Sequence, residues 1–78
     1  MNFDNNIPIY LQVIDKIKAD IIAGKLNPGD KMPSTRDLAK EIGINPNTAA
    51  RVYKEMEILG LCFKKRGLGT FITESDEM

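Results

Sequence analysis

Residues 43 to 46, Gly-Ile-Asn-Pro, constrain the fold of this chain more than any other stretch of its sequence. Gly43 is a helix-ending residue, because glycine readily adopts the left-handed conformation that closes a helix. Asn45-Pro46 starts a new helix, since an asparagine side chain can accept a hydrogen bond from the first turn and proline there lacks only an N–H that has no helical partner. The sequence therefore predicts two helices joined by a very short turn.

Apolar side chains recur at helical spacing in three segments, which we predict to be helices over residues 9–23, 35–42 and 46–59. Ser34 is expected to cap the second helix, with Asp37 at its positive end. Between the first two helices, Lys31-Met32 is predicted to be a short extended piece, because Pro33 disfavours helix at the preceding residue.

The C-terminal part of the sequence predicts a β-hairpin. Strands are expected over residues 61–64 and 70–73, around a turn in which Gly67 and Gly69 permit positive φ angles. The predicted fold class is therefore α+β and mainly α: a winged helix-turn-helix with three helices and a C-terminal two-stranded β-hairpin, the wing. We expect one domain over residues 1–78, with a core from about 7 to 73 and an acidic, frayed tail at 74–78.

Composition argues against catalysis. The chain has 78 residues, no histidine and one cysteine, so it offers no Ser-His or Cys-His pair, no internal disulfide and no cysteine-rich zinc site. A domain of this size is expected to commit nearly all its apolar side chains to one core, leaving few to line a substrate pocket. We expect no enzyme activity, no cofactor and no metal. Neither a membrane span nor a signal peptide is apparent, so a cytoplasmic protein with a reduced thiol is expected.

Charge is segregated along the chain although the formal net charge is +0. Residues 34–70 carry seven basic and four acidic side chains, whereas residues 71–78 carry three acidic side chains and no basic one. An α-helix fits the major groove of B-DNA, and a basic hairpin can reach phosphates or the minor groove. Double-stranded DNA is therefore the predicted partner. The structural alternative is a small helical domain whose hairpin only covers the core.

Residues spaced over about positions 7 to 73 resemble the DNA-binding domain of GntR-type bacterial transcription regulators. The positions that carry the resemblance are Pro8-Ile9-Tyr10, Gln12, Ile17, Gly24-Lys25-Leu26, Pro28-Gly29-Asp30, Met32-Pro33-Ser34, Arg36, Leu38, Ala39, Asn45-Pro46-Asn47-Thr48, Tyr53, Met56-Glu57, Gly60 and Arg66-Gly67-Leu68-Gly69-Thr70-Phe71. The segment 45–48 is similar to the YtrA branch, whose members join this domain to a short helical dimerisation tail and commonly control transporter operons.

The resemblance implies a sequence-specific regulator, a repressor rather than an activator, on a two-fold symmetric operator. It also implies a homodimer, formed on DNA or through a C-terminal region that these residues do not include. Two positions depart from the family pattern. Met32 replaces the usual leucine, and Pro46 and Ala50 stand where many members carry arginines, so the base-reading pattern of those members does not transfer.

Two candidate DNA contacts lie at the start of the second helix. Arg36 aligns with an arginine that contacts phosphate or bases in the family, and its cation opposes the helix dipole, which suggests a role outside the helix. Its alternative is a solvated or aspartate-paired side chain. Thr35 is a candidate donor to a phosphate, with a purely structural role as its alternative, whereas Ser34 is explained by capping alone.

The first turns of the third helix carry the candidates for base reading. Asn47 is the predicted base reader, because an asparagine amide can pair with adenine N7 and N6; its alternative is a second cap. Thr48 is a candidate for a phosphate or a thymine methyl, or for a backbone carbonyl. Arg51 is either a DNA contact or the partner of Glu55 in an i,i+4 ion pair. Asn45 is mainly a cap and a secondary candidate for a contact with the DNA backbone.

The wing supplies the remaining candidates, Lys65, Arg66 and Gly67, with Lys64 beside them at the predicted tip. They are expected to contact phosphates and the minor groove, and Gly67 also serves the turn; the alternative is a charged edge that prevents strand pairing. An alternative function for the whole chain is a winged helix used as a protein-interaction module, which would need a more apolar outer face on the third helix.

Three other residues are predicted to have structural roles. Cys62 is predicted to be a small strand residue, and Tyr10 and Tyr53 to be core or interface aromatics with their hydroxyls at the rim.

Overall fold

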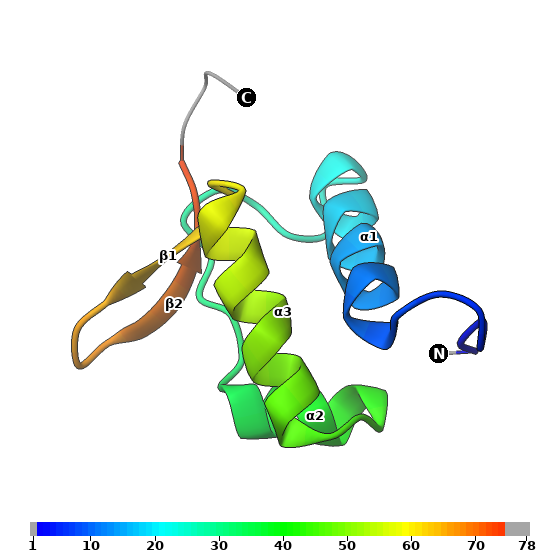
Figure 1. Ribbon diagram of the computed structural model, residues 1–78. Helices are drawn as coiled ribbons and strands as arrows, with labels where there is room; N and C mark the ends of the chain where they lie inside the picture. Colours follow the sequence, from blue (N-terminus) through cyan, green and yellow to red (C-terminus); the bar gives the residue numbers. More distant parts are fainter. Residues whose placement is uncertain (1, 75–78) are drawn as a thin grey trace.

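The computed structural model describes residues 2–74, and over these residues it contains three helices followed by an antiparallel hairpin (Figure 1). The elements are α1 (Ile9–Ile22), α2 (Thr35–Ile42), α3 (Pro46–Ile58), β1 (Cys62–Lys65) and β2 (Gly69–Ile72). Helix α3 lies in the middle, with α1 on one side and the wing on the other, and α2 crosses near its start. The predicted fold class is confirmed, while positions 75–78 of the predicted tail lie outside the described residues.

Helices α2 and α3 begin where their capping residues stand. The Ser34 hydroxyl accepts a hydrogen bond from the Asp37 amide at 3.1 Å, and the Asn45 side chain accepts one from the Asn47 amide at 2.8 Å. Between them, Gly43 closes α2 with a φ of 82°, in the left-handed region. The predicted bounds of α2 and the predicted start of α3 are confirmed. Helices α1 and α3 each end one residue earlier than predicted, with Ala23 and Leu59 as their C-caps.

One core joins all the elements. Its buried apolar members are Val13, Ile14, Ile17, Met32, Leu38, Ala39, Ala49, Val52, Tyr53, Met56, Cys62 and Ile72. The expectation that nearly every apolar side chain enters this core is wrong, because several large ones are exposed: Ile7, Ile9, Leu11, Ile22, Ile58, Leu59 and Leu68. A domain this small has too much surface relative to its volume to enclose them all.

Both strands begin and end one residue away from the predicted positions. Leu61 is not part of β1, because its amide donates to the Met56 carbonyl at 2.9 Å and completes the closure of α3. The hairpin pairs Cys62 with Ile72 and Lys65 with Gly69, and residues 66–68 form the turn. Lys64 therefore lies in a strand, as its predicted range implied, and Lys65 moves from the predicted turn into β1. Neither lysine lies at the tip, which corrects that part of the prediction.

The extended piece before α2 is confirmed and pairs with the wing. Lys31 forms an antiparallel bridge with Phe71, and the Met32 amide donates to the Thr70 carbonyl at 2.7 Å. The chain that enters α2 is therefore hydrogen-bonded to β2. No helix within residues 2–74 is long and apolar enough to cross a membrane.

Candidate nucleic-acid interface

Helix α3 has a buried face and an exposed face of opposite character. Ala49, Val52, Tyr53 and Met56 are buried against the other elements. The exposed face carries Asn47, Ala50, Arg51, Lys54 and Ile58. Most of this face is polar or basic, and at its start Pro46 and Asn47 are exposed next to the first turn of α2.

The polar residues at the start of α3 are used differently from one another. The Asn45 side chain is engaged as the cap. Asn47 is exposed, and among the described residues its side chain takes no part in a hydrogen bond, so the alternative of a second cap is not observed. Thr48 is half-buried, and no hydrogen bond from its hydroxyl to a backbone carbonyl occurs within residues 2–74. Base reading by Asn47 stays a prediction.

Arg51 contacts an aromatic ring of another helix. Its guanidinium carbon lies 3.9 Å from the centroid of the Tyr10 ring, in the first turn of α1. The ion pair with Glu55 that we considered as an alternative is not formed; within the described chain the observed ion pair joins Lys16 and Asp20 at 2.9 Å. Arg51 therefore contacts a ring in an adjacent helix and not a carboxylate along α3. The spacing of residues in the sequence does not indicate this contact.

The start of α2 presents Thr35 and Arg36 next to each other. Arg36 is exposed, and no carboxylate of residues 2–74 lies within ion-pairing distance, so the aspartate-paired alternative is not observed. Thr35 is half-buried and lines two grooves, one between α2 and the wing and one between α3 and β1. Thr35 shares the second of these grooves with Lys64 of the wing, whereas Arg36 lines a different groove, with Ile44 and Pro46 at the turn between α2 and α3.

The basic residues of the wing fall on different faces of the hairpin. The Lys65 ammonium lies 5.7 Å from the Phe63 ring centroid and 5.3 Å from that of Phe71, and the two rings are stacked at 5.9 Å. Lys64 instead lines the groove against α3, together with Lys54. Because successive strand residues face opposite ways, the three cations do not form one cluster at the tip as predicted. Arg66 is exposed in the turn.

Gly67 has a φ of 79° in that turn, a conformation that favours glycine. Next to it, Leu68 is 60% exposed. We did not predict this apolar side chain as a site residue, although a leucine flanked by two glycines in a predicted turn was a signal that it would protrude.

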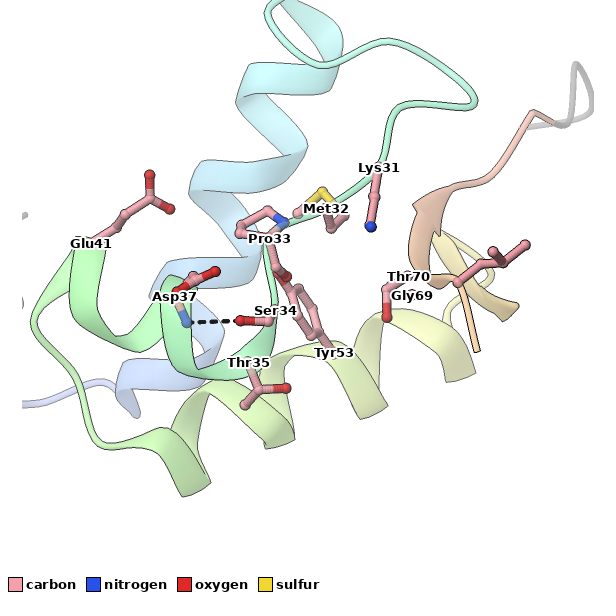
Figure 2. A pocket seen from close by; sticks show the side chains of 11 residues that line it. Lys31, Met32, Pro33, Ser34, Thr35, Asp37, Glu41, Tyr53, Gly69 and Thr70 are labelled. Carbon is pink, nitrogen blue, oxygen red and sulfur yellow. Dashed lines mark hydrogen bonds between the residues drawn. The ribbon is translucent and has the colours of Figure 1, made fainter. Parts of the chain in front are cut away.

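A groove separates the start of α2 from the wing, and Figure 2 shows its lining. Lys31 and Thr70 lie at the wing end, whereas Asp37 and Glu41 lie at the α2 end. The Lys31 side chain crosses Gly69 closely: a Cβ at that glycine would lie 3.0 Å from the Lys31 Cε. Lys31 is a further cation beside the wing that sequence analysis placed only in an extended piece.

Two buried groups behind this surface, the Tyr53 hydroxyl and the Cys62 thiol, have structural roles. The Tyr53 hydroxyl donates to the Pro33 carbonyl at 2.5 Å, and burial raises the Tyr53 pKa well above its ordinary range, with smaller contributions from nearby acidic groups. The Cys62 thiol donates to the Tyr53 carbonyl at 3.8 Å, and burial raises the pKa of Cys62 to about 11. Both groups are protonated at neutral pH. The predictions of Cys62 as a strand residue and Tyr53 as a core aromatic are confirmed.

The sequence matches a family model described as bacterial regulatory proteins, gntR family, over residues 9–72. It is 47% identical over 76 residues to the uncharacterized HTH-type transcriptional regulator YhcF of Bacillus subtilis, a match that covers 97% of this chain and 63% of YhcF. It is 45% identical to the HTH-type transcriptional repressor YtrA of Bacillus subtilis, covering 91% of this chain and 55% of YtrA. The chain thus spans less than two thirds of the length of these relatives.

Solved structures with the same fold include a GntR family transcriptional regulator from Listeria monocytogenes. It is 38% identical, with a TM-score of 0.89 and coverage of 94% of this chain and 64% of that one. The DNA-binding domain of AraR in complex with operator ORX1 is 30% identical, with a TM-score of 0.79 and coverage of 86% of this chain and 81% of that one. The three-helix and hairpin arrangement is therefore one that a solved complex holds on operator DNA.

Proposed function

Because this chain belongs to the GntR family of bacterial regulatory proteins, we propose that it is the part of a transcription regulator that binds double-stranded DNA sequence-specifically. The observation that carries the proposal is the exposed face of α3: Asn47 is exposed in its first turn, and the helix lies between α1 and the wing (Figure 1). A helix presented in this way fits the major groove, while elements on either side meet the two DNA strands.

In this proposal the residues divide into base readers and backbone contacts. Asn47 enters the groove and reads a base, since its amide is exposed and the capping role is filled by Asn45. Asn45 and Thr48 lie beside it and contact the sugar-phosphate backbone. Thr35 and Arg36 do so from the start of α2, where Arg36 has no intramolecular ion partner among the described residues.

The wing meets the DNA beside the groove that α3 enters. Lys65, Arg66 and Gly67 are the proposed contacts, with the cations on phosphates and the glycine allowing the turn to approach closely. Lys64 faces the groove between β1 and α3, so it serves a phosphate nearer to α3. Arg51 contacts DNA from the α1 side.

We further propose that the regulator is a cytoplasmic repressor that acts as a homodimer on a two-fold symmetric operator. The relative YtrA is described as a repressor, and two copies of this fold on one site give the affinity that a single small domain lacks. Exposed apolar side chains at the C-terminal ends of α1 and α3, among them Ile22 and Ile58, leave that end available for protein contacts. We propose that residues 1–78 form a single DNA-binding domain, with its core over about 7–73.

Selection of bound sequences from random duplexes, followed by fluorescence anisotropy with the selected duplex, tests the proposal. We expect one preferred half-site and an affinity that falls steeply with salt concentration. Arg36→Ala should weaken binding to all duplexes, whereas Lys25→Ala, which removes an exposed cation after α1, should leave it unchanged. Recovery of no sequence above background, with equally weak binding by wild type and both variants, would reject the function.

A further inference from the structure

We propose that Tyr10 is a positioning residue for DNA binding, which holds the Arg51 guanidinium toward a phosphate of the DNA backbone and away from the bases. The inference rests on the proposed function, because it assumes that α3 enters the major groove. It assigns a role to Tyr10, a residue of α1 for which sequence analysis predicted only packing.

The contact between Tyr10 and Arg51 is stabilised by residues that hold α1 in place. Gln12, two residues further along the chain, fixes the segment before α1: its side-chain nitrogen donates to the Asp4 and Ile7 carbonyls at 2.8 Å each. Its side-chain oxygen accepts from the Asp4 amide, also at 2.8 Å. Buried residues further along α1, such as Val13 and Ile14, hold the helix in the core. The half-buried Tyr10 ring, which packs against the core, therefore lies on a well-held helix and restricts the longer Arg51 side chain.

A stacked guanidinium keeps its hydrogen-bonding capacity. The ring covers one face of the group, while the five N–H donors lie in the guanidinium plane and remain directed outward. Within residues 2–74 no carboxylate lies within ion-pairing distance of Arg51, so these donors are available to a ligand. Fixing the side chain before binding lowers the entropy that is lost when a contact to DNA forms.

The direction of the stack points to a phosphate. Asn47 and Lys54 lie along the exposed face of α3, which would face the base edges at the floor of the groove. The contact with Tyr10 draws Arg51 from this face toward α1, and so toward one wall of the groove, where the DNA backbone runs. The start of α2 and the wing lie on the other side of α3 (Figure 1). Contacts from both sides of α3 would then hold the helix between the sugar-phosphate backbones of the two DNA strands.

A double-mutant cycle tests the coupling, with the affinity for the selected duplex measured over a range of salt concentrations. Arg51→Ala should weaken binding to every duplex about tenfold and lower the salt slope by about one, with the preferred base sequence unchanged. Tyr10→Leu should weaken binding about threefold, whereas Tyr10→Phe, which keeps the ring face, should stay close to wild type. In the Arg51→Ala background, Tyr10→Leu should have no further effect.

The free protein gives an independent measurement. The side-chain Nε–H resonance of Arg51 should show the shift caused by the tyrosine ring in wild type and in Tyr10→Phe, and should lose it in Tyr10→Leu. If Tyr10→Leu fails to fold, Arg51→Lys replaces it in the comparison: it keeps the charge and the salt slope but loses the planar stack, and should bind about threefold more weakly.

Two results would overturn the inference while leaving the proposed function intact. One is an equal loss of affinity on Tyr10→Leu with and without Arg51, which would give Tyr10 a role of its own. The other is a changed base preference at one position in Arg51→Ala, which would make Arg51 a base reader. Failure of the wild-type chain to bind any duplex would instead count against the proposed function itself.

Discussion

The α2–α3 pair and the wing both present residues that we propose to contact DNA, but they hold these residues in different ways. In the α2–α3 pair, Ser34 and Asn45 spend their side chains on capping, and both helices contribute to the core. In the wing, Lys65 and Arg66 are exposed and Lys65 rests only on two aromatic rings. In the α2–α3 pair, the residues that stabilise the fold and those proposed to bind DNA are therefore neighbours in the chain. In the wing, the proposed DNA contacts can be changed without affecting stability.

The sharpest way to test this contrast is to shorten one apolar side chain in each region. Met56 in α3 is fully buried, so Met56→Ala should lower the free energy of unfolding by about 2 to 5 kcal/mol, through lost burial and the cavity left behind. Leu68→Ala in the exposed wing turn is the matched control and should change it by less than about 0.5 kcal/mol. Urea unfolding followed by circular dichroism measures both. Similar losses for the two variants would remove the contrast.

Alkaline pH should destabilise the place where the two regions meet. The pKa of Cys62 rises from 9.0 to about 11 in the fold, and that of Tyr53 also rises from its ordinary value of 10.0. Above about pH 9 the unfolded chain loses protons that the folded chain retains, so stability is fully present below that pH and falls as pH rises. The slope is at most about 1.4 kcal/mol per pH unit for each group.

Denaturation midpoints measured from pH 7 to 10.5 check this expectation. Cys62→Ala should flatten the fall that begins near pH 9, because the variant lacks the thiol whose pKa the fold raises. A stability of wild type that stays constant over this range would contradict the assignment of both groups as buried and protonated.

At the start of α3, two asparagines distinguish helix capping from base reading. Asn47→Ala should cost about 1 to 3 kcal/mol on the preferred duplex and little on random duplexes, because only a base contact is lost. Asn45→Ala should lower stability by about 1 kcal/mol and weaken specific and random duplexes alike, since it removes the cap of α3. Anisotropy and thermal unfolding distinguish the two. A loss of thermal stability in Asn47→Ala would make Asn47 structural, and base reading would have to be sought elsewhere.

The smallest effect on stability should come from the charged wing. The combined change Lys65→Ala, Arg66→Ala should leave the unfolding midpoint within about 0.5 kcal/mol of wild type, since both side chains are exposed. The same variant should lower the salt slope of DNA binding by about two. An unchanged slope would assign these cations to the protection of a strand edge instead.

How far the sequence predicted the molecule also differs between the two regions. The bounds of α2 and the start of α3 were predictable because caps act locally, through residues two or three positions apart. The strand positions were missed by one residue, since whether Leu61 closes α3 or extends β1 depends on a hydrogen bond across Gly60.

The contacts between distant segments were not predictable from spacing. Arg51 on Tyr10 and Lys31 across Gly69 each join parts of the chain that only tertiary packing brings together. Periodicity and capping describe residues within one element, so they predicted that Arg51 is exposed and offered Glu55 as a partner. They carried no information about the ring that occupies the neighbouring helix.

The closure of α3 by Leu61 fixes the position of the wing relative to α3. Because the Leu61 amide is bonded to Met56 and β1 begins at the next residue, no slack exists between the end of α3 and the wing. In the proposed complex, the distance between α3 and the hairpin is therefore fixed, and it fits adjacent grooves at one spacing only. Adding a residue at Gly60 would change this distance without altering any proposed contact residue. A duplex with wider or narrower grooves would then contact α3 or the hairpin, but not both at once.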